Sequence, residues 1–310
     1  MSEIFQRILV GVDAEGLARA AVVRGYDLAR ELESELELVH AVEVPPPLWP
    51  GIGEEQLSEM HAAVIDASRQ RTLQALDEAL QEPFPDVDPE ASLEVVPGKP
   101  ARVLLQRAEE REVDLLVLGP HGQRATFDFG STARAVLARA ACPVWNQLGP
   151  VQSVERILVP VDFSEQSRDA AGLAARLARR LGASLTVLHG HQPMPLANPE
   201  VAEAFPDPGE ILDQAREAAE RELAGWVEEL EGDAPRVRPL LVEEAPAQTI
   251  RREAENHDLV VMGTHGRTGL SRFLLGSVAY AVLKHAEKPV LVVPRVERSW
   301  QLGGNTSGAS

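Results

Sequence analysis

The sequence predicts two α/β domains in tandem, each a doubly wound, Rossmann-like parallel sheet of five strands in the order 3-2-1-4-5. Two observations predict this fold. The same pattern of residues occurs twice along the 310-residue chain, and within each copy short apolar runs alternate with segments of helical periodicity. Continuous runs of Val, Leu and Ile are typical of parallel strands that helices cover on both faces.

The repeat is visible residue by residue. ILVGVD from Ile8 recurs as ILVPVD from Ile157, so Asp13 matches Asp162 and His40 matches His189. Further along, VDLLVLGPHG recurs as HDLVVMGTHG, and ARAVLARAACPVW recurs as AYAVLKHAEKPVL. Two homologous domains follow from this match.

The domain boundaries lie where the apolar pattern stops. The first domain spans 1–149 and the second 154–297, because QLGPVQS at 147–153 interrupts the pattern with Gly and Pro. The Gly- and Ser-rich tail at 298–310 has too little apolar surface to join a core and is expected to be disordered.

The elements of the second copy follow one another in a fixed alternation. Strands are expected where apolar residues run without interruption, and helices where they recur at intervals of three and four. In chain order these are strand 156–161, helix 165–181, strand 184–189, helix 209–231, strand 236–242, helix 246–256, strand 258–263, helix 277–286 and strand 289–294.

A glycine-studded loop joins the fourth strand of the second copy to its last helix. Gly263 and Gly266 allow close backbone approach, and Gly276-Ser277 opens the helix, where unpaired amide groups favour an anion. Arg267 and Arg272 add positive charge, so phosphate fits this loop best. Ordinary loop chemistry explains the same glycines equally well when the loop is taken alone.

The predicted topology favours a ligand. Doubly wound sheets bind ligands beyond the carboxyl ends of their strands, at the point where the strand order reverses. Strands one and four flank that point in the order 3-2-1-4-5. Asp162 ends strand one and the Gly263 loop ends strand four, so the two features are expected to share one crevice.

The sequence resembles the universal stress protein family, and the resemblance covers nearly the whole chain as two tandem copies. It is most complete in the second copy. The family's Gly-x2-Gly-x9-Gly-Ser/Thr pattern stands complete, preceded by PVDFS at 160–164. The resemblance implies a cytoplasmic, regulatory stress-response protein that holds ATP, with or without Mg²⁺, its base and ribose near strands one and two and its phosphates on the glycine loop. The implied binding residues are Pro160, Asp162, Gly190, Met262, Gly263, Gly266, Gly276, Ser277 and Val278. Gly190 stands where the family often has Val.

The first copy departs from this pattern. Gly119, Gly122, Gly130 and Ser131 are present, but the second and third glycines are two residues closer together than in the second copy. Pro120 stiffens the turn, and Asp128 places a carboxylate where it competes with phosphate. Gly11 replaces Pro160, and Ala14-Glu15 replaces Phe163-Ser164. This copy is expected to bind nucleotide poorly or to bind another ligand.

Composition excludes several classes of partner. The formal net charge of −18, with no block of Lys and Arg, argues against nucleic acid and anionic membranes. No apolar run is long enough to span a bilayer. The single cysteine, Cys142, rules out an intramolecular disulfide and suits a reducing cytoplasm.

Enzymatic motifs are missing from the sequence. No P-loop and no GxSxG elbow occur, so we expect no catalytic residues, with slow ATP hydrolysis left open. His121 and His265 are expected to shape their turns. One alternative is a metal-dependent hydrolase using His189, His191 and Asp162, although a strand-end role is favoured for the histidines. Another is an interaction protein that needs no nucleotide.

The last strand of each copy would be an exposed apolar edge. The segments at 142–147 and 288–293 are therefore expected to pair with each other and make an intrachain pseudo-dimer. The sequence leaves further homodimerisation open.

Overall fold

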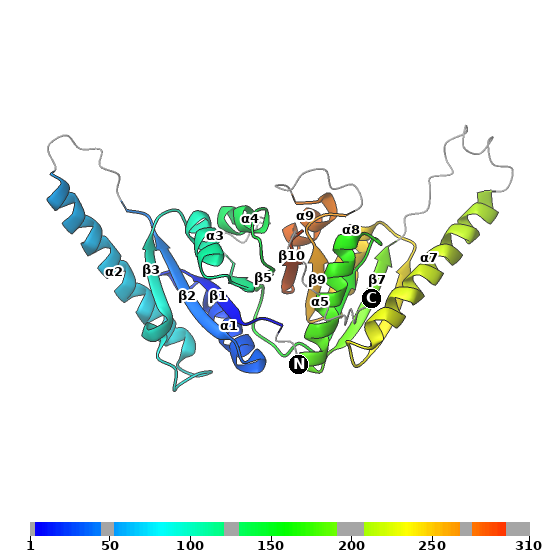
Figure 1. Cartoon of the computed structure of the whole chain (residues 1–310), viewed down its shortest axis with the longest axis horizontal. Coiled ribbons are helices and arrows are strands. Elements are labelled where there is room, and N and C mark those ends of the chain that lie inside the picture. Colours follow the sequence, from blue (N-terminus) through cyan, green and yellow to red (C-terminus); the bar gives the residue numbers. More distant parts are fainter. Residues whose placement is uncertain (1–3, 45–52, 121–129, 191–207, 267–274, 296–310) are drawn as a thin grey trace, which may run out of the picture.

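The computed structural model describes residues 4–44, 53–120, 130–190, 208–266 and 275–295 (Figure 1). The predicted tail, Arg267, Arg272, His121, Gly122, Asp128 and His191 lie outside these ranges. The first half contains β1 (Arg7–Val12), α1 (Arg19–Leu32), β2 (Glu35–Val42), α2 (Glu54–Leu80), a 3-10 helix (Pro89–Ser92), β3 (Leu93–Pro97), α3 (Pro100–Glu110), β4 (Leu115–Leu118), α4 (Ser131–Leu137) and β5 (Val144–Asn146).

The second half repeats this order. It contains β6 (Arg156–Pro160), α5 (Glu165–Leu181), β7 (Ser184–Gly190), α7 (Pro208–Glu231), β8 (Val237–Val242), α8 (Pro246–Ala254), β9 (Leu259–Gly263), α9 (Ser277–Lys284) and β10 (Val290–Val293). Each element lies within two residues of the range that the sequence predicts. The predicted α/β fold is confirmed.

All ten of these strands form a single sheet. Its order is β3-β2-β1-β4-β5-β10-β9-β6-β7-β8, so each half has the predicted order 3-2-1-4-5. The strands are parallel within each half, whereas β5 and β10 pair antiparallel, with Leu291 opposite Trp145. The expected pairing of the two edge strands inside one chain is confirmed, and the pairing protects both apolar edges.

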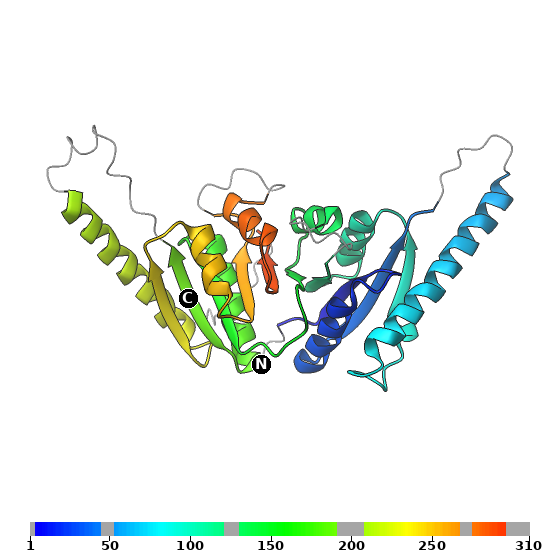
Figure 2. The ribbon, with the colours of Figure 1, turned by 180° about the vertical axis from the view of Figure 1, so that it is seen from behind.

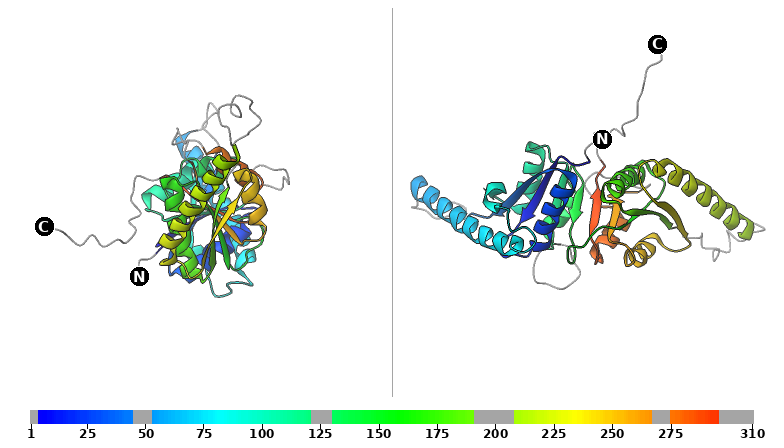
Figure 3. Two further views of the ribbon diagram at one scale, coloured as in Figure 1. Left: turned by 90° about the vertical axis from the view of Figure 1, so that its right-hand side faces the viewer. Right: turned by 90° about the horizontal axis from the view of Figure 1, so that it is seen from below.

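Helices cover both faces of this sheet. One core packs α1, α2, α5 and α7 against it, and the other packs α3, α4, α8 and α9. Successive strand residues alternate between the cores, as Val10 and Leu9 do, and both cores run through the two halves. The long helices α2 and α7 lie at opposite ends of the molecule (Figures 1 and 2). Seen from below, the two halves lie side by side (Figure 3, right).

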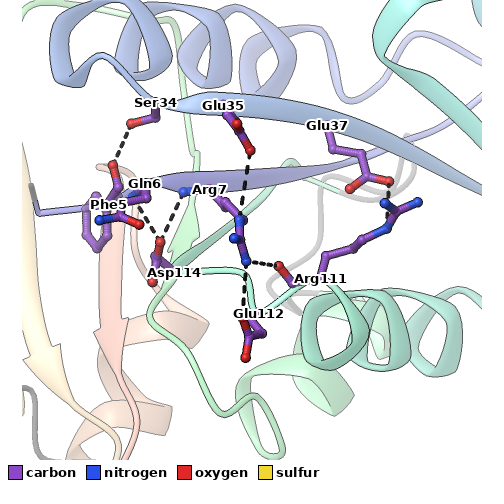
Figure 4. Close-up of polar contacts among 9 residues, drawn as sticks. All are labelled: Phe5, Gln6, Arg7, Ser34, Glu35, Glu37, Arg111, Glu112 and Asp114. Atoms are coloured by element: carbon purple, nitrogen blue, oxygen red, sulfur yellow. Dashed lines mark hydrogen bonds and ion pairs between the residues drawn. The ribbon is translucent and has the colours of Figure 1, made fainter.

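The strand starts are tied together in the same way in both halves. The Asp114 carboxylate, just before β4, accepts hydrogen bonds from the backbone N–H groups of Gln6 and Arg7, at 2.9 and 3.0 Å (Figure 4). Asp258, just before β9, accepts from the N–H groups of Glu155 and Arg156, at 3.1 and 2.9 Å. Each aspartate thereby ties together the starts of strands one and four of its half.

The seam between the halves contains a buried cation. Arg24 on α1 donates to the Gln152 carbonyl at 2.5 Å and to Gln147 Oε1 at 3.3 Å, and it lies over the Trp145 ring. Burial lowers the pKa of Arg24. Gly149 turns the connecting segment with a φ of +66°. The Arg24 side chain thus anchors the segment that joins β5 to β6.

None of the described helices is long and apolar enough to cross a membrane.

Candidate functional site

The candidate site lies at the carboxyl ends of β6 and β9, which are neighbours in the sheet. Strand order reverses between these strands, which is the usual ligand position in this architecture. The nine residues predicted from the sequence are all described. They occupy the ends of β6, β7 and β9, the loop that follows each of β6 and β9, and the start of α9: Pro160, Asp162, Gly190, Met262, Gly263, Gly266, Gly276, Ser277 and Val278.

Asp162 is held by the turn that begins α5. Phe163 has a positive φ of 62°, which bends the chain back so that Ser164 reaches the preceding carboxylate. The Ser164 hydroxyl donates to Asp162 Oδ1 at 2.5 Å, and the Ser164 N–H donates to the same oxygen at 3.2 Å. Ser164 Oγ also accepts from the Ser167 N–H and so caps α5. Because Ser164 caps the helix, Asp162 is not needed for that role.

The glycines of the loop occupy positions of close approach. A Cβ on Gly266 would stand 2.3 Å from Asp162 Oδ2, so the loop backbone lies directly against this carboxylate. A Cβ on Gly276 would meet the Thr264 carbonyl oxygen at 3.0 Å, and the Gly276 N–H donates to that oxygen at 2.7 Å. The structure therefore brings Asp162, Gly266 and Gly276 into one site, as the topology predicts.

The presence of glycine at position 190 has a structural reason that is separate from the loop. A Cβ there would lie 3.0 Å from Pro246 Cα and 3.4 Å from the Glu244 carbonyl oxygen. The start of α8 occupies the space that a valine side chain would need. The glycine at this position therefore accommodates the neighbouring helix.

The remaining predicted residues differ in exposure. The Met262 side chain lies in the core with 4% of its surface exposed, and the Val278 side chain packs against the same core. Pro160 is half-buried, whereas Ser277 is exposed at the first turn of α9. Ser277 is thus the predicted side chain most open to a ligand, and Met262 can contribute through its backbone.

A polar brace supports the loop from below. Gln166 Nε2 on α5 donates to Thr264 Oγ1 at 2.6 Å and lies 3.4 Å from the Val293 carbonyl oxygen. Thr264 Oγ1 is also 3.0 Å from His265 Nδ1. Sequence reasoning missed Gln166 and Thr264. A comparison of the two copies could have found them. The first copy, whose glycine pattern is altered, has the non-polar residues Leu17 and Pro120 at the matching positions.

The histidines at the strand ends have structural partners. His189 Nδ1 bonds the Val161 carbonyl oxygen at 2.8 Å, and His40 Nδ1 bonds Val12 in the same way at 3.0 Å. The His189 ring also packs on Phe163, with 4.2 Å between ring centroids. Among the described residues, no group of three His, Cys, Asp or Glu side chains is arranged to hold a metal ion.

The first half has a cavity of about 290 Å³ at the equivalent position. Its lining includes Asp13, His40 and Gly119, which match residues around the second crevice. Asp13, however, is committed to its own loop. Its Oδ1 accepts from the N–H groups of Glu15 and Leu17, at 2.8 and 3.0 Å, and its Oδ2 accepts from Ala18 at 2.7 Å.

Cys142 lies away from both crevices, before β5. It is buried, and burial raises the pKa of its thiol to about 12. The thiolate, which is the reactive form, is therefore absent near neutral pH.

Two duplicated halves, each a doubly wound domain of five parallel strands, define a tandem α/β protein. The universal stress protein family matches residues 4–145 and again residues 153–294. The chain therefore belongs to the universal stress protein family, as two copies in tandem, and the resemblance seen in its motifs is confirmed.

Known proteins of similar length agree. The universal stress protein Rv2005c of Mycobacterium tuberculosis is 30% identical over 92% of this chain and 96% of its own length. The universal stress protein Rv2623 of the same organism is 29% identical over 92% of this chain and 95% of its own length. In the crystal structure of a universal stress protein from Archaeoglobus fulgidus, 17% identical, the fold superposes with a TM-score of 0.60 over 95% of this chain and the whole of that one.

Proposed function

We propose that this stress protein binds ATP in the crevice of its second half and acts as a cytoplasmic regulator. The observation that carries the proposal is the close approach of the Gly266 backbone to Asp162, in a loop that follows β9 and leads to Ser277 at the start of α9. A loop that lies this close to the carboxylate and ends at a helix N-terminus suits a ligand with a hydroxyl-bearing body and an anionic end.

The parts of ATP fit different parts of the crevice. Asp162 is an acceptor and therefore suits ribose hydroxyls rather than phosphate. The amide groups at the start of α9 and the Ser277 hydroxyl suit phosphate oxygens. Mg²⁺ would accompany the phosphates as a counterion and would not need a dedicated cluster of carboxylates.

We propose that the protein is not an enzyme, or hydrolyses ATP only slowly. General-base catalysis needs a group within hydrogen-bond reach of the attacking water. Asp162 is held by Ser164 and lies against Gly266, at the end of the crevice assigned to the ribose. Regulation by bound nucleotide needs no such base.

The first half is proposed to take no ATP. Three backbone N–H groups occupy the Asp13 carboxylate, which leaves it little capacity to accept hydrogen bonds from a ribose. Glu15 and Glu43 also line the cavity. Together with Asp13 they outnumber the positive charge of Arg71, so the charge of the lining disfavours phosphate. One ATP per chain is therefore expected.

Mass analysis of nucleotide released from denatured, freshly purified protein tests the proposal. ATP or ADP at close to one equivalent per chain supports it. Protein that carries no nucleotide, and that takes up none after incubation with millimolar Mg-ATP, favours the alternative of an interaction protein that needs no nucleotide. Stoichiometric metal together with turnover would favour the hydrolase alternative.

A further inference from the structure

The side chains of Gln166, Thr264 and His265 form a hydrogen-bonded chain beneath the glycine loop. Gln166 is 7% exposed and Thr264 5% exposed, so both are shielded from solvent. The Gln166 amide nitrogen lies 2.6 Å from Thr264 Oγ1, which lies 3.0 Å from His265 Nδ1. Buried chains of this kind fix where each proton lies.

The direction of the chain follows from its donors and acceptors. The Gln166 amide group faces the Val293 carbonyl oxygen, which can only accept, so its nitrogen and not its oxygen belongs there. That nitrogen can only donate, and Thr264 Oγ1 therefore accepts from it. The Thr264 hydroxyl proton is then free to be donated, and His265 Nδ1 is the acceptor it meets among the described residues.

This direction sets the tautomer of His265. If Nδ1 accepts a hydrogen bond, a neutral imidazole carries its proton on Nε2. Within the described part of the chain, His265 Nε2 is buried and has no hydrogen-bond partner. A buried N–H group without an acceptor is unfavourable, which indicates that an acceptor outside the protein completes the chain.

His265 lies between the two ends of the proposed nucleotide site. A Cβ on Gly276, at the start of α9, would stand 3.3 Å from His265 Cα, and the next residue, Gly266, lies against Asp162. An acceptor at this place is most simply an oxygen of the ligand that the loop holds.

We propose that His265 donates a hydrogen bond from Nε2 to a phosphoryl oxygen of the bound nucleotide, and that Gln166 and Thr264 are positioning residues that set its tautomer. The proposal rests on the proposed function. It goes beyond the expectation that His265 shapes its turn. The first half cannot build the same chain, because Leu17 has no donor and Pro120 has no hydroxyl.

The tautomer is tested by ¹⁵N NMR of the His265 ring in the nucleotide-free protein. The chain predicts a protonated Nε2 and an unprotonated Nδ1. Thr264→Val should convert this state into a mixture of tautomers, whereas Thr264→Ser, which keeps the hydroxyl, should preserve it. Protonated Nδ1 in the wild-type protein would overturn the proposal, whatever the protein binds.

The ligand contact is tested by calorimetry with ATP and with adenosine, which lacks phosphate. In His265→Gln the amide nitrogen can replace Nε2, whereas in His265→Asn it can replace only Nδ1. We expect His265→Asn to weaken ATP binding about tenfold and His265→Gln to weaken it much less, with adenosine affinity unchanged in both. Equal losses in the two variants, or equal losses for ATP and adenosine, would refute the contact while leaving ATP binding itself intact. No ATP binding by the wild-type protein would refute both this inference and the proposed function.

Discussion

The two halves of this protein carry matched aspartates, Asp162 and Asp13, whose hydrogen bonds differ. Asp162 is held by Ser164, which also caps α5, whereas Asp13 itself accepts from three backbone N–H groups ahead of α1. When the copies are aligned on these aspartates, α1 begins three residues later than α5. In the first copy the aspartate accepts from the Ala18 N–H group, whose counterpart in the second copy, the Ser167 N–H group, donates to the capping serine.

This difference teaches that the hydrogen bonds of a carboxylate depend on the residues next to it. Glu15 stands where Ser164 stands in the second copy and forms no cap of the same kind. Without that cap, unpaired amide groups at the start of the helix turn to the closest acceptor. A change two residues away can therefore redirect the hydrogen bonds of a carboxylate while the fold remains the same.

The largest expected effect is stabilisation by the nucleotide. If the dissociation constant is about 1 μM, millimolar Mg-ATP adds about 4 kcal/mol to the stability of the second half. Thermal scans should show an increase of several degrees in the wild-type melting temperature. Ser277→Ala should reduce the ATP effect by about 1 kcal/mol and the adenosine effect hardly at all. The same shift with ATP in wild-type and Ser277→Ala protein would exclude Ser277 from the phosphate site.

Gly266→Ala tests the contact between the loop and the carboxylate. The added methyl group would meet Asp162 Oδ2 at 2.3 Å, and we expect a loss of about 2 kcal/mol in stability together with weaker ATP binding. In the double variant with Asp162→Ala, most of the loss in stability should disappear because the opposing oxygen is gone. Additive losses in urea unfolding would show that the two residues do not touch.

Substituting each of the matched aspartates should separate an effect on the free energy of unfolding from an effect on nucleotide binding. Asp13→Ala removes the acceptor for three N–H groups and should destabilise the first half by about 1 to 2 kcal/mol, with ATP binding unchanged. Asp162→Ala should cost less stability, because Ser164 still caps α5, and should weaken ADP and ATP alike. Urea unfolding and calorimetry on both variants measure the two effects. A loss of ATP binding in Asp13→Ala, or a larger loss of stability in Asp162→Ala than in Asp13→Ala, would contradict the comparison.

The smallest expected effect depends on pH. His257 is 1% exposed, its Nδ1 bonds the Glu253 carbonyl at 2.6 Å, and burial lowers its pKa. The unfolded chain therefore binds a proton first as the pH falls below about 6.5, so stability is lost in acid. Between about pH 7.5 and 5.5 the free energy of unfolding should therefore fall with pH, with a slope due to His257 that cannot exceed the single-proton limit of about 1.4 kcal/mol per pH unit.

The first copy supplies the control for that prediction, since Val113 occupies the position of His257. His257→Val should lower the dependence of the free energy of unfolding on pH, whatever it does to stability at pH 7.5. An unchanged slope would show that the folded protein does not hold His257 neutral.

Much of the fold could be predicted because duplication, apolar runs and helical spacing are visible in the residues themselves. The strand order and the β5–β10 pairing followed from these patterns and from the need to cover two apolar edges. The nearness of Asp162 to the loop that follows Gly263 followed from topology, whereas the close approach of Gly266 to the carboxylate was not predicted. The three hydrogen bonds to Asp13 did not follow from topology either, because they depend on backbone angles in the turn at Gly16, where φ is +75°.

The brace beneath the loop escaped prediction for a different reason. Gln166 and Thr264 are 98 residues apart, and neither belongs to a recognisable motif. Their contact arises because α5 packs on the end of β9, which a pattern of residue types does not specify. Arg24 at the seam is a similar case, because its partners belong to the segment that links the halves.

Calorimetric titration of nucleotide-stripped protein with Mg-ATP tests the central claim most directly. The account predicts one ATP per chain, lost in Gly276→Asp, where a carboxylate would occupy the phosphate position, and retained in the matched Gly130→Asp. Two equivalent sites in the wild-type protein, or loss of binding in Gly130→Asp with retention in Gly276→Asp, would contradict it.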